Sequence, residues 1–143
     1  MGAASATAIL WPAVAMAGLT FLVWVRLYQV RLGEMARKRI HAQSLASAAD
    51  AARLLSDTRA SDNFRNLFEV PVLFYAGVLL AAQLGVADAA SLALAWAFVG
   101  LRAVHSAVHC TFNHVMTRFV VYALATLALV ALWVRIALAL AAA

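Results

Sequence analysis

Apolar residues fill four long segments of the chain, at about 4–28, 63–84, 91–115 and 118–141. Each is long enough to cross a bilayer as a helix, which takes about 20 mostly apolar residues, and none alternates as a membrane strand would. Asp62 is a candidate N-cap for the second segment. The polar stretch 31–61 lacks proline, which favours helical extensions or a surface helix there. The pattern therefore predicts one all-α domain over residues 1–143, a four-helix transmembrane bundle.

The composition agrees with this pattern. The chain is 66% hydrophobic and 12% charged, with a mean hydropathy of +0.91, whereas a soluble domain is about 45–50% apolar and about 25% charged. These values exclude a water-soluble fold, because a chain of 143 residues has too little interior to bury so many apolar side chains. The single cysteine, Cys110, excludes an intrachain disulfide framework.

The positive charge is concentrated on one side of the predicted membrane. A net charge of +5 could indicate a nucleic-acid partner, but in a membrane protein it favours the positive-inside rule, so we expect no nucleic acid. The stretch 31–61 and the turn at 115–118 carry nearly all the lysines and arginines, whereas Asp88 is the charged residue of the opposite connection. We therefore expect 31–61 to be cytoplasmic and both termini to lie outside. The first segment lacks a basic n-region, which favours a retained helix over a cleaved signal peptide.

Ionisable and polar side chains inside the predicted helices converge near the cytoplasmic side. An ionisable residue costs about 2.5–3.5 kcal/mol near the bilayer centre on insertion scales, so such residues point to function. They are Arg31 in the first helix, Arg65, Asn66 and Glu69 in the second, Arg102, His105, His109 and Asn113 in the third, and Arg118 and Tyr122 in the fourth. Spacings of three or four residues within each set place its members on one helix face. Four arginines against one glutamate leave a surplus of positive charge, which predicts a site for an anion.

Other interpretations of these residues remain open. The outer arginines could reach lipid headgroups instead of a ligand, whereas Arg102 lies too deep to do so easily. His105 and His109 are spaced for a metal, but the arginines nearby would repel a cation, so we expect no metal. Glu69 and His105 could relay protons in a small transporter, yet the sequence shows no inverted repeat.

Four sets of residues follow one another along the chain. They are Tyr28-Gln-Val-Arg31-Leu, Arg65-Asn66-Leu-Phe-Glu69 with Pro71, Gly100-Leu-Arg102-Ala-Val-His105-Ser, and Arg118 with Tyr122. Together they resemble the MAPEG family, membrane-associated proteins in eicosanoid and glutathione metabolism. The short loops and high alanine content resemble bacterial members, which implies a bacterial inner membrane. The resemblance also implies a homotrimer with glutathione between adjacent protomers at the cytoplasmic side.

The resemblance, carried over position by position, implies two groups of site residues. Glutathione would be bound by Arg31, Arg65, Asn66, Glu69, Arg102 and His105. Arg118 would stabilise its thiolate, with Tyr122 as a second donor to the sulfur. The implied activity is that of a glutathione transferase or peroxidase acting on a hydrophobic electrophile from the membrane. Phe119 departs from the pattern, since a prostaglandin synthase of the family has a serine there. The alternative is a non-catalytic member of the fold that binds an anionic lipid or a protein partner.

Overall fold

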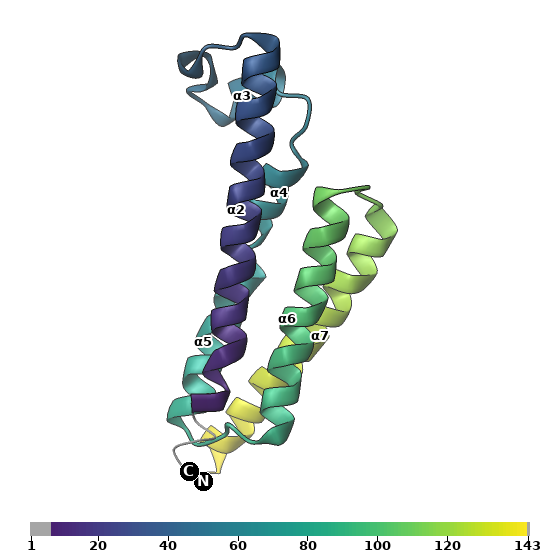
Figure 1. Cartoon of the computed structure of the whole chain (residues 1–143). Coiled ribbons are helices and arrows are strands. Elements are labelled where there is room, and N and C mark those ends of the chain that lie inside the picture. The colour runs from purple at the N-terminus through teal and green to yellow at the C-terminus, as the bar shows by residue number, and fades with distance from the viewer. Residues whose placement is uncertain (1–6, 143) are drawn as a thin grey trace.

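The computed structural model describes residues 7–142, which are all-α as the sequence predicts and contain no strand (Figure 1). The helices are α2 (Leu10–Lys38), the short 3-10 helix η1 (Ala42–Leu45), α3 (Ala48–Leu54), α4 (Arg59–Asn66), α5 (Val70–Gln83), α6 (Ala89–Cys110) and α7 (Val115–Ala141). Four helical stretches are long and apolar enough to cross a membrane, namely α2, α4 with α5, α6, and α7. The chain is therefore a multi-pass integral membrane protein.

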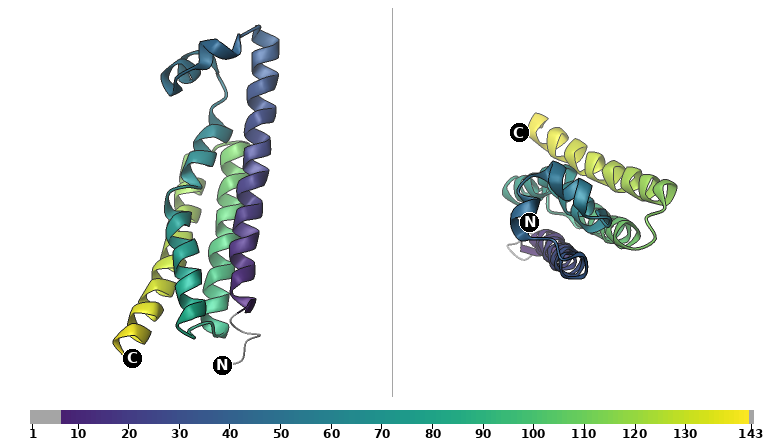
Figure 2. Two further views of the ribbon diagram at one scale, coloured as in Figure 1. Left: turned by 90° about the vertical axis from the view of Figure 1, so that its left-hand side faces the viewer. Right: turned by 90° about the horizontal axis from the view of Figure 1, so that it is seen from above.

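The helices pack as two pairs (Figures 1 and 2). α2 lies beside α4 and α5, and α6 forms an antiparallel pair with α7. The pairs meet largely through α6, which contacts both α2 and α4. The start of α2 and the end of α7 lie at one end of the bundle, whereas η1, α3 and the α6–α7 turn lie at the other. Lys38 and most of the arginines belong to segments at this second end, which we call the polar end.

The second span is two helices rather than one. α4 ends at Asn66 and α5 begins at Val70, where Pro71 occupies the first turn and has no N–H to continue the upstream helix. The span also begins earlier than expected, and Asp62 lies inside the first turn of α4 instead of capping it. Asp57 Oδ1 accepts the backbone N–H of Arg59 at 3.2 Å, which supports this earlier start.

The third helix ends sooner than the polar pattern predicts. α6 stops at Cys110, and Asn113 adopts a left-handed conformation with φ of 54° in the turn before α7. The backbone N–H of Asn113 donates to Val108 O at 2.8 Å, which closes the end of α6. His114 then caps α7, since its Nδ1 accepts the N–H of Thr117 at 3.3 Å. Asn113 is therefore a turn residue and does not continue the stripe of Arg102 and its neighbours.

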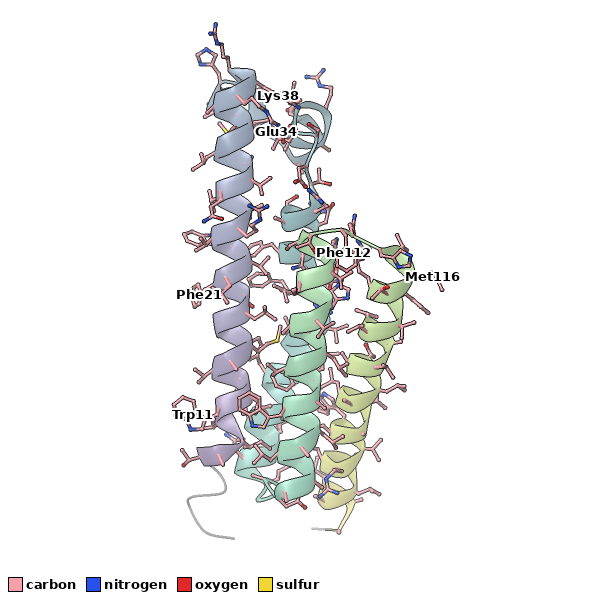
Figure 3. All side chains as sticks on the ribbon, turned by 45° about the vertical axis from the view of Figure 1, so that its right-hand side comes forward. Trp11, Phe21, Glu34, Lys38, Phe112 and Met116 are labelled. Carbon is pink, nitrogen blue, oxygen red and sulfur yellow. The ribbon has the colours of Figure 1, made fainter. Side chains whose placement is uncertain are left out.

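The polar stretch 31–61 is largely helical, as the sequence predicts. Its first part extends α2, and η1 and α3 fold back over the end of that helix (Figure 2). The buried carboxylate of Glu34 anchors the fold-back, because it accepts the backbone N–H of Ser56 at 2.8 Å and pairs with Lys38 at 2.5 Å. Lys38 Nζ also donates to Ser56 Oγ at 2.7 Å. Figure 3 shows Glu34 and Lys38 together at the polar end.

Between the ends, the bundle has an apolar interior and an apolar exterior. Phe74 of α5 stacks on Phe98 of α6 with ring centroids 4.4 Å apart, and both side chains are wholly buried. Large apolar side chains are also exposed on the outer faces, and Trp11 and Phe21 point away from the bundle in Figure 3. A continuous apolar surface of this kind fits the hydrocarbon of a bilayer.

Asp88 closes the end of the bundle opposite the polar end. Its carboxylate accepts the backbone N–H of Ser91 at 2.9 Å and pairs with Arg135 of α7. Arg135 Nε also donates to Ser91 Oγ at 3.0 Å. The hydrogen bond from Ser91 lowers the pKa of Asp88 below its usual value. These contacts tie the start of α6 to α7.

Candidate functional site

Arg102 lies at the centre of the candidate site. Its side chain on α6 is wholly buried, and Nη2 donates to Asn66 Oδ1 at 2.6 Å and to Asn66 O at 3.2 Å. The guanidinium carbon also lies 5.8 Å from the ring centroid of Tyr122 on α7. Nε and Nη1 of Arg102 are buried without a hydrogen-bond partner among residues 7–142. A buried guanidinium with two unused donors is unfavourable unless an acceptor reaches it.

The break between α4 and α5 positions Asn66 and Glu69. Asn66 Nδ2 donates to Glu69 Oε2 at 3.0 Å, so the amide links this exposed carboxylate to Arg102. Arg65 and Glu69 form no ion pair in the described part of the chain. Of the expected shared face of Arg65, Asn66 and Glu69, the contact between Asn66 and Glu69 forms, whereas the helix is interrupted before Glu69 and Arg65 does not pair with it.

His105 contributes a proton acceptor. Its Nδ1 lies 3.1 Å from the backbone oxygen of Arg118, and a carbonyl only accepts, so Nδ1 carries the proton. In the neutral ring, Nε2 then holds a lone pair, and this atom is buried with no partner among the described residues. The ring of His105 lies 6.0 Å from that of Tyr122, centroid to centroid.

Arg118 is held by the turn that precedes α7. Its Nη1 donates to Asn113 Oδ1, and its Nε is buried without a partner within residues 7–142. Asn113, whose backbone is left-handed, thus helps to position Arg118, because its side-chain amide oxygen binds one side of the guanidinium. Tyr122 follows one turn later on α7.

The structure brings six of the eight expected site residues together and places two elsewhere. We call the six the arginine cluster: Asn66, Glu69, Arg102, His105, Arg118 and Tyr122. Arg31 and Arg65 instead line a cavity of about 700 Å³ between α2, α4 and the fold-back, which we call the basic pocket. Asp57 and Asp62 share this pocket, and residues 45–52 form its roof.

The histidines do not form a metal cluster with other ligands. The rings of His105 and His109 meet edge to face at 5.6 Å. Within residues 7–142, no three side chains of His, Cys, Asp or Glu gather as metal ligands. The buried arginine beside the histidines also disfavours a cation.

A comparison with models of known families decides the classification. The model of the MAPEG family matches residues 9–138, nearly the whole chain. The chain belongs to the MAPEG family. Searches of curated proteins and of solved structures found no match. Members of the MAPEG family generally use glutathione as a substrate or cofactor and are generally oligomeric.

Sequence analysis missed a second polar contact in this MAPEG chain, next to the arginine cluster. Asn63 of α4 is wholly buried, accepts a hydrogen bond from Ser106 Oγ at 3.3 Å and donates to Cys110 Sγ at 3.4 Å. The sequence does carry a signal for this contact, since Asn63 is a polar residue one turn before Asn66 in a mostly apolar segment. Polar residues in such segments often form hydrogen bonds between helices. Both hydrogen bonds are made within the chain itself, so we assign Asn63 to the packing of α4 on α6.

Proposed function

We propose that this chain is a membrane enzyme that binds glutathione at the arginine cluster and acts on hydrophobic electrophiles as a transferase or peroxidase. The observation that carries the proposal is the wholly buried guanidinium of Arg102, whose Nε and Nη1 have no partner among the described residues. Removing a cation from water without a compensating charge is costly. The cluster therefore suits an anionic ligand, and the family generally uses one.

The groups of glutathione match the residues of the cluster. Its two carboxylates suit the free donors of Arg102 and the guanidinium groups of Arg31 and Arg65 through charge-assisted hydrogen bonds. Its amino group suits Glu69, whose carboxylate is exposed and uses only Oε2 on Asn66. Both ends of the peptide backbone can thus be held by charges of the opposite sign.

The remaining residues suit activation of the thiol. A cysteine thiol with a pKa near 8.5 is mostly protonated at neutral pH. His105 Nε2 has a lone pair that can accept this proton, and the free Nε of Arg118 can stabilise the sulfur anion, with Tyr122 as a second donor. In transfer, a bond forms between the sulfur and an electrophilic carbon while the leaving group departs with its electron pair. Reduction of a peroxide would instead oxidise two glutathione molecules to their disulfide.

The proposal includes the placement and assembly of the chain. We propose a homotrimer in a bacterial inner membrane, with the polar end in the cytoplasm and both termini outside. The positive-inside rule supports this orientation, because Lys38 and most arginines belong to the polar end. The proposed glutathione site consists of the arginine cluster together with Arg31 and Arg65, which line the basic pocket of the single chain and would meet the ligand between adjacent protomers.

Glutathione titration of the detergent-purified protein tests the proposal. Calorimetry measures binding, and ultraviolet absorbance measures the thiolate. We expect saturable binding with thiolate formation, and loss of the thiolate in Arg118→Ala. Arg37→Ala is a matched control, since Arg37 is an exposed arginine of α2 that does not line the cluster.

Each other outcome has a distinct meaning. An Arg118→Ala variant that still forms the thiolate would remove Arg118 from the mechanism. Binding without a thiolate, even in the unaltered protein, would support a non-catalytic member of the family. No binding by a folded oligomer would refute the glutathione site itself.

A further inference from the structure

Two segments that are far apart in the chain meet at the polar end. The linker between α3 and α4 contains Asp57, and α4 begins with Arg59. Nη1 of Arg59 donates to the backbone oxygen of Thr111, the residue that caps the end of α6. Arg59 therefore joins the start of α4 to residues 111–114, which form the turn between α6 and α7. Both segments belong to one chain, so this contact does not depend on a neighbouring copy.

The guanidinium of Arg59 is oriented by Asp57. Nε donates to Oδ1 at 2.9 Å and Nη2 donates to Oδ2 at 2.7 Å, so a planar fork binds both oxygens of the carboxylate. This pairing lowers the pKa of Asp57 below its usual value. The backbone N–H of Asp57 also donates to Glu34 Oε2 at 3.3 Å, which ties the linker to α2. The remaining nitrogen of the fork, Nη1, is thereby directed at Thr111.

The turn between α6 and α7 depends on this contact from outside. Within residues 7–142, Arg59 makes the only hydrogen bond that reaches residues 111–114 from beyond α6 and α7. The hydroxyl of Thr111 and the backbone N–H of Asn113 donate to carbonyls of α6 instead. The last carbonyls of a helix have no partner within it, and a cation near them is favoured by the helix dipole. Arg59 therefore fixes the direction in which the chain leaves α6.

The same turn carries the residue that holds Arg118. Asn113 follows Thr111 by two residues, and its Oδ1 accepts a hydrogen bond from Nη1 of Arg118. The backbone N–H of Arg118 also donates to His114 O at 3.0 Å. A displacement of Thr111 is therefore passed to the amide that binds the guanidinium of Arg118, because only a short, hydrogen-bonded turn separates them.

We propose that Asp57 and Arg59 are positioning residues for Arg118. Arg59 holds the turn in place, the turn holds Arg118, and Arg118 stabilises the thiolate of glutathione. This inference rests on the proposed function and deepens it, since it names residues that set the acidity of the thiol without touching it. The side chains of Arg59 and Asp57 are 40% and 30% exposed. An ion pair this exposed contributes little to stability, so we expect variants of it to stay folded.

The pH midpoint of thiolate formation tests the proposal, measured by ultraviolet absorbance of glutathione bound to the detergent-purified protein. Arg59→Gln should raise the midpoint by about half a unit, about threefold in the thiolate equilibrium, because a loosened Arg118 stabilises the anion less. The affinity for glutathione below the midpoint should stay within about twofold, since Arg59 makes no contact with the arginine cluster. Arg53→Gln is the matched control, because Arg53 of α3 also pairs with an aspartate, Asp50 at 3.5 Å, but does not reach the turn.

Asp57→Asn separates positioning from a direct effect of charge. It keeps an oxygen for the backbone N–H of Arg59 and removes the charged oxygen that binds Nη2. Removing a negative charge by itself would favour the thiolate and lower the midpoint. Positioning predicts the opposite sign, because a guanidinium without its fork holds Thr111 less well, so we expect the midpoint to rise. A lowered or unchanged midpoint in Asp57→Asn would refute the proposal.

A double variant tests whether Arg59 acts through the turn. Changes within one hydrogen-bonded network are not additive. Arg59→Gln combined with Asn113→Gly should therefore raise the midpoint by about one unit, no more than Asn113→Gly alone. Shifts that add would mean that Arg59 affects the thiol by a route other than the turn, and would overturn the proposal.

Hydrogen exchange of the ligand-free protein distinguishes failure of this inference from failure of the proposed function. In Arg59→Gln, the backbone N–H of Asn113 should exchange about threefold faster, because the turn opens more often, and in Arg53→Gln it should not change. Faster exchange in Arg59→Gln, together with an unaltered protein that forms no thiolate, would refute the proposed function but support the hold of Arg59 on the turn. Unchanged exchange in Arg59→Gln would overturn the inference whether or not glutathione binds.

Discussion

Two groups of arginines lie at the polar end, and the fold places them in opposite environments. In the arginine cluster, Arg102 is wholly buried and Arg118 is half-buried, with donors that no described residue uses. In the basic pocket, Arg31 and Arg65 line an open cavity that water can enter. A ligand that binds a buried donor without a partner gains a large favourable free energy of binding. The same contact with a hydrated arginine contributes much less, because water already binds its donors. The difference in burial therefore predicts that the two groups contribute unequally to the binding of an anion.

The largest expected effect comes from removing one arginine of each group. Arg102→Met should weaken glutathione binding at least about thirtyfold, because truncating one partner of a buried charge contact costs about 2–5 kcal/mol. Arg65→Met should weaken glutathione binding less, by about threefold, because that guanidinium is exposed to solvent. Calorimetric titration of the two purified variants measures both values. Equal losses would mean that burial does not determine how much each arginine contributes.

The sequence predicts the helices of this end better than it predicts how its arginines divide into two groups. Hydropathy over about 20 residues identifies four spans, because that signal is local to each helix. It does not separate Arg65 from Asn66, although neighbouring residues on a helix point about 100° apart. Arg65 lines the basic pocket, whereas Asn66 binds Arg102. The spacing of polar residues also continues the stripe of α6 to Asn113, beyond the end of the helix at Cys110. The separation of Arg65 from Asn66 and the end of α6 both depend on helix breaks and on packing between helices. Residue spacing along a single helix does not predict either of them.

A smaller effect is expected from loosening Arg118 inside the cluster. Asn113→Gly keeps the left-handed backbone, which glycine adopts freely, but removes the oxygen that binds Arg118. We expect the pH midpoint of thiolate formation to rise by about one unit, which corresponds to about 1.4 kcal/mol. Ultraviolet absorbance of bound glutathione against pH measures this shift. Asn113→Ala should show the same shift together with lower thermal stability, because a side chain with a Cβ is strained at this φ. An unshifted midpoint in Asn113→Gly would show that Arg118 is positioned without Asn113.

The next effect concerns the roof of the basic pocket and should leave the cluster unchanged. Ser56→Ala removes the hydroxyl that binds Glu34 and Lys38 and that holds the fold-back against α2. The free energy of unfolding should then fall by about 1 kcal/mol, because one hydrogen bond that orders the roof is lost. Thermal unfolding in detergent measures the effect, and Ser44→Ala, a serine of η1 whose side chain makes no hydrogen bond in the described structure, is the control. Faster loss of glutathione in Ser56→Ala would mean that the fold-back covers the cluster as well.

The smallest effect is expected at the end of the bundle opposite both groups of arginines. The hydrogen bond from the Ser91 N–H lowers the pKa of Asp88 in the folded chain. The stabilisation by this carboxylate is therefore complete above its ordinary pKa of 3.8 and is lost as the pH falls through its lower pKa in the folded chain. Asp88→Asn keeps an oxygen for Ser91 but removes the charge that faces Arg135. At neutral pH it should lower the free energy of unfolding by no more than about 1 kcal/mol, because the ion pair is largely exposed to solvent. Thermal unfolding in detergent from about pH 3 to pH 7 should show a shallower acid dependence than in the unaltered protein. Glutathione binding should be unchanged, and a change would mean that the two ends are coupled, so that burial at the polar end alone would not explain how its two groups of arginines differ.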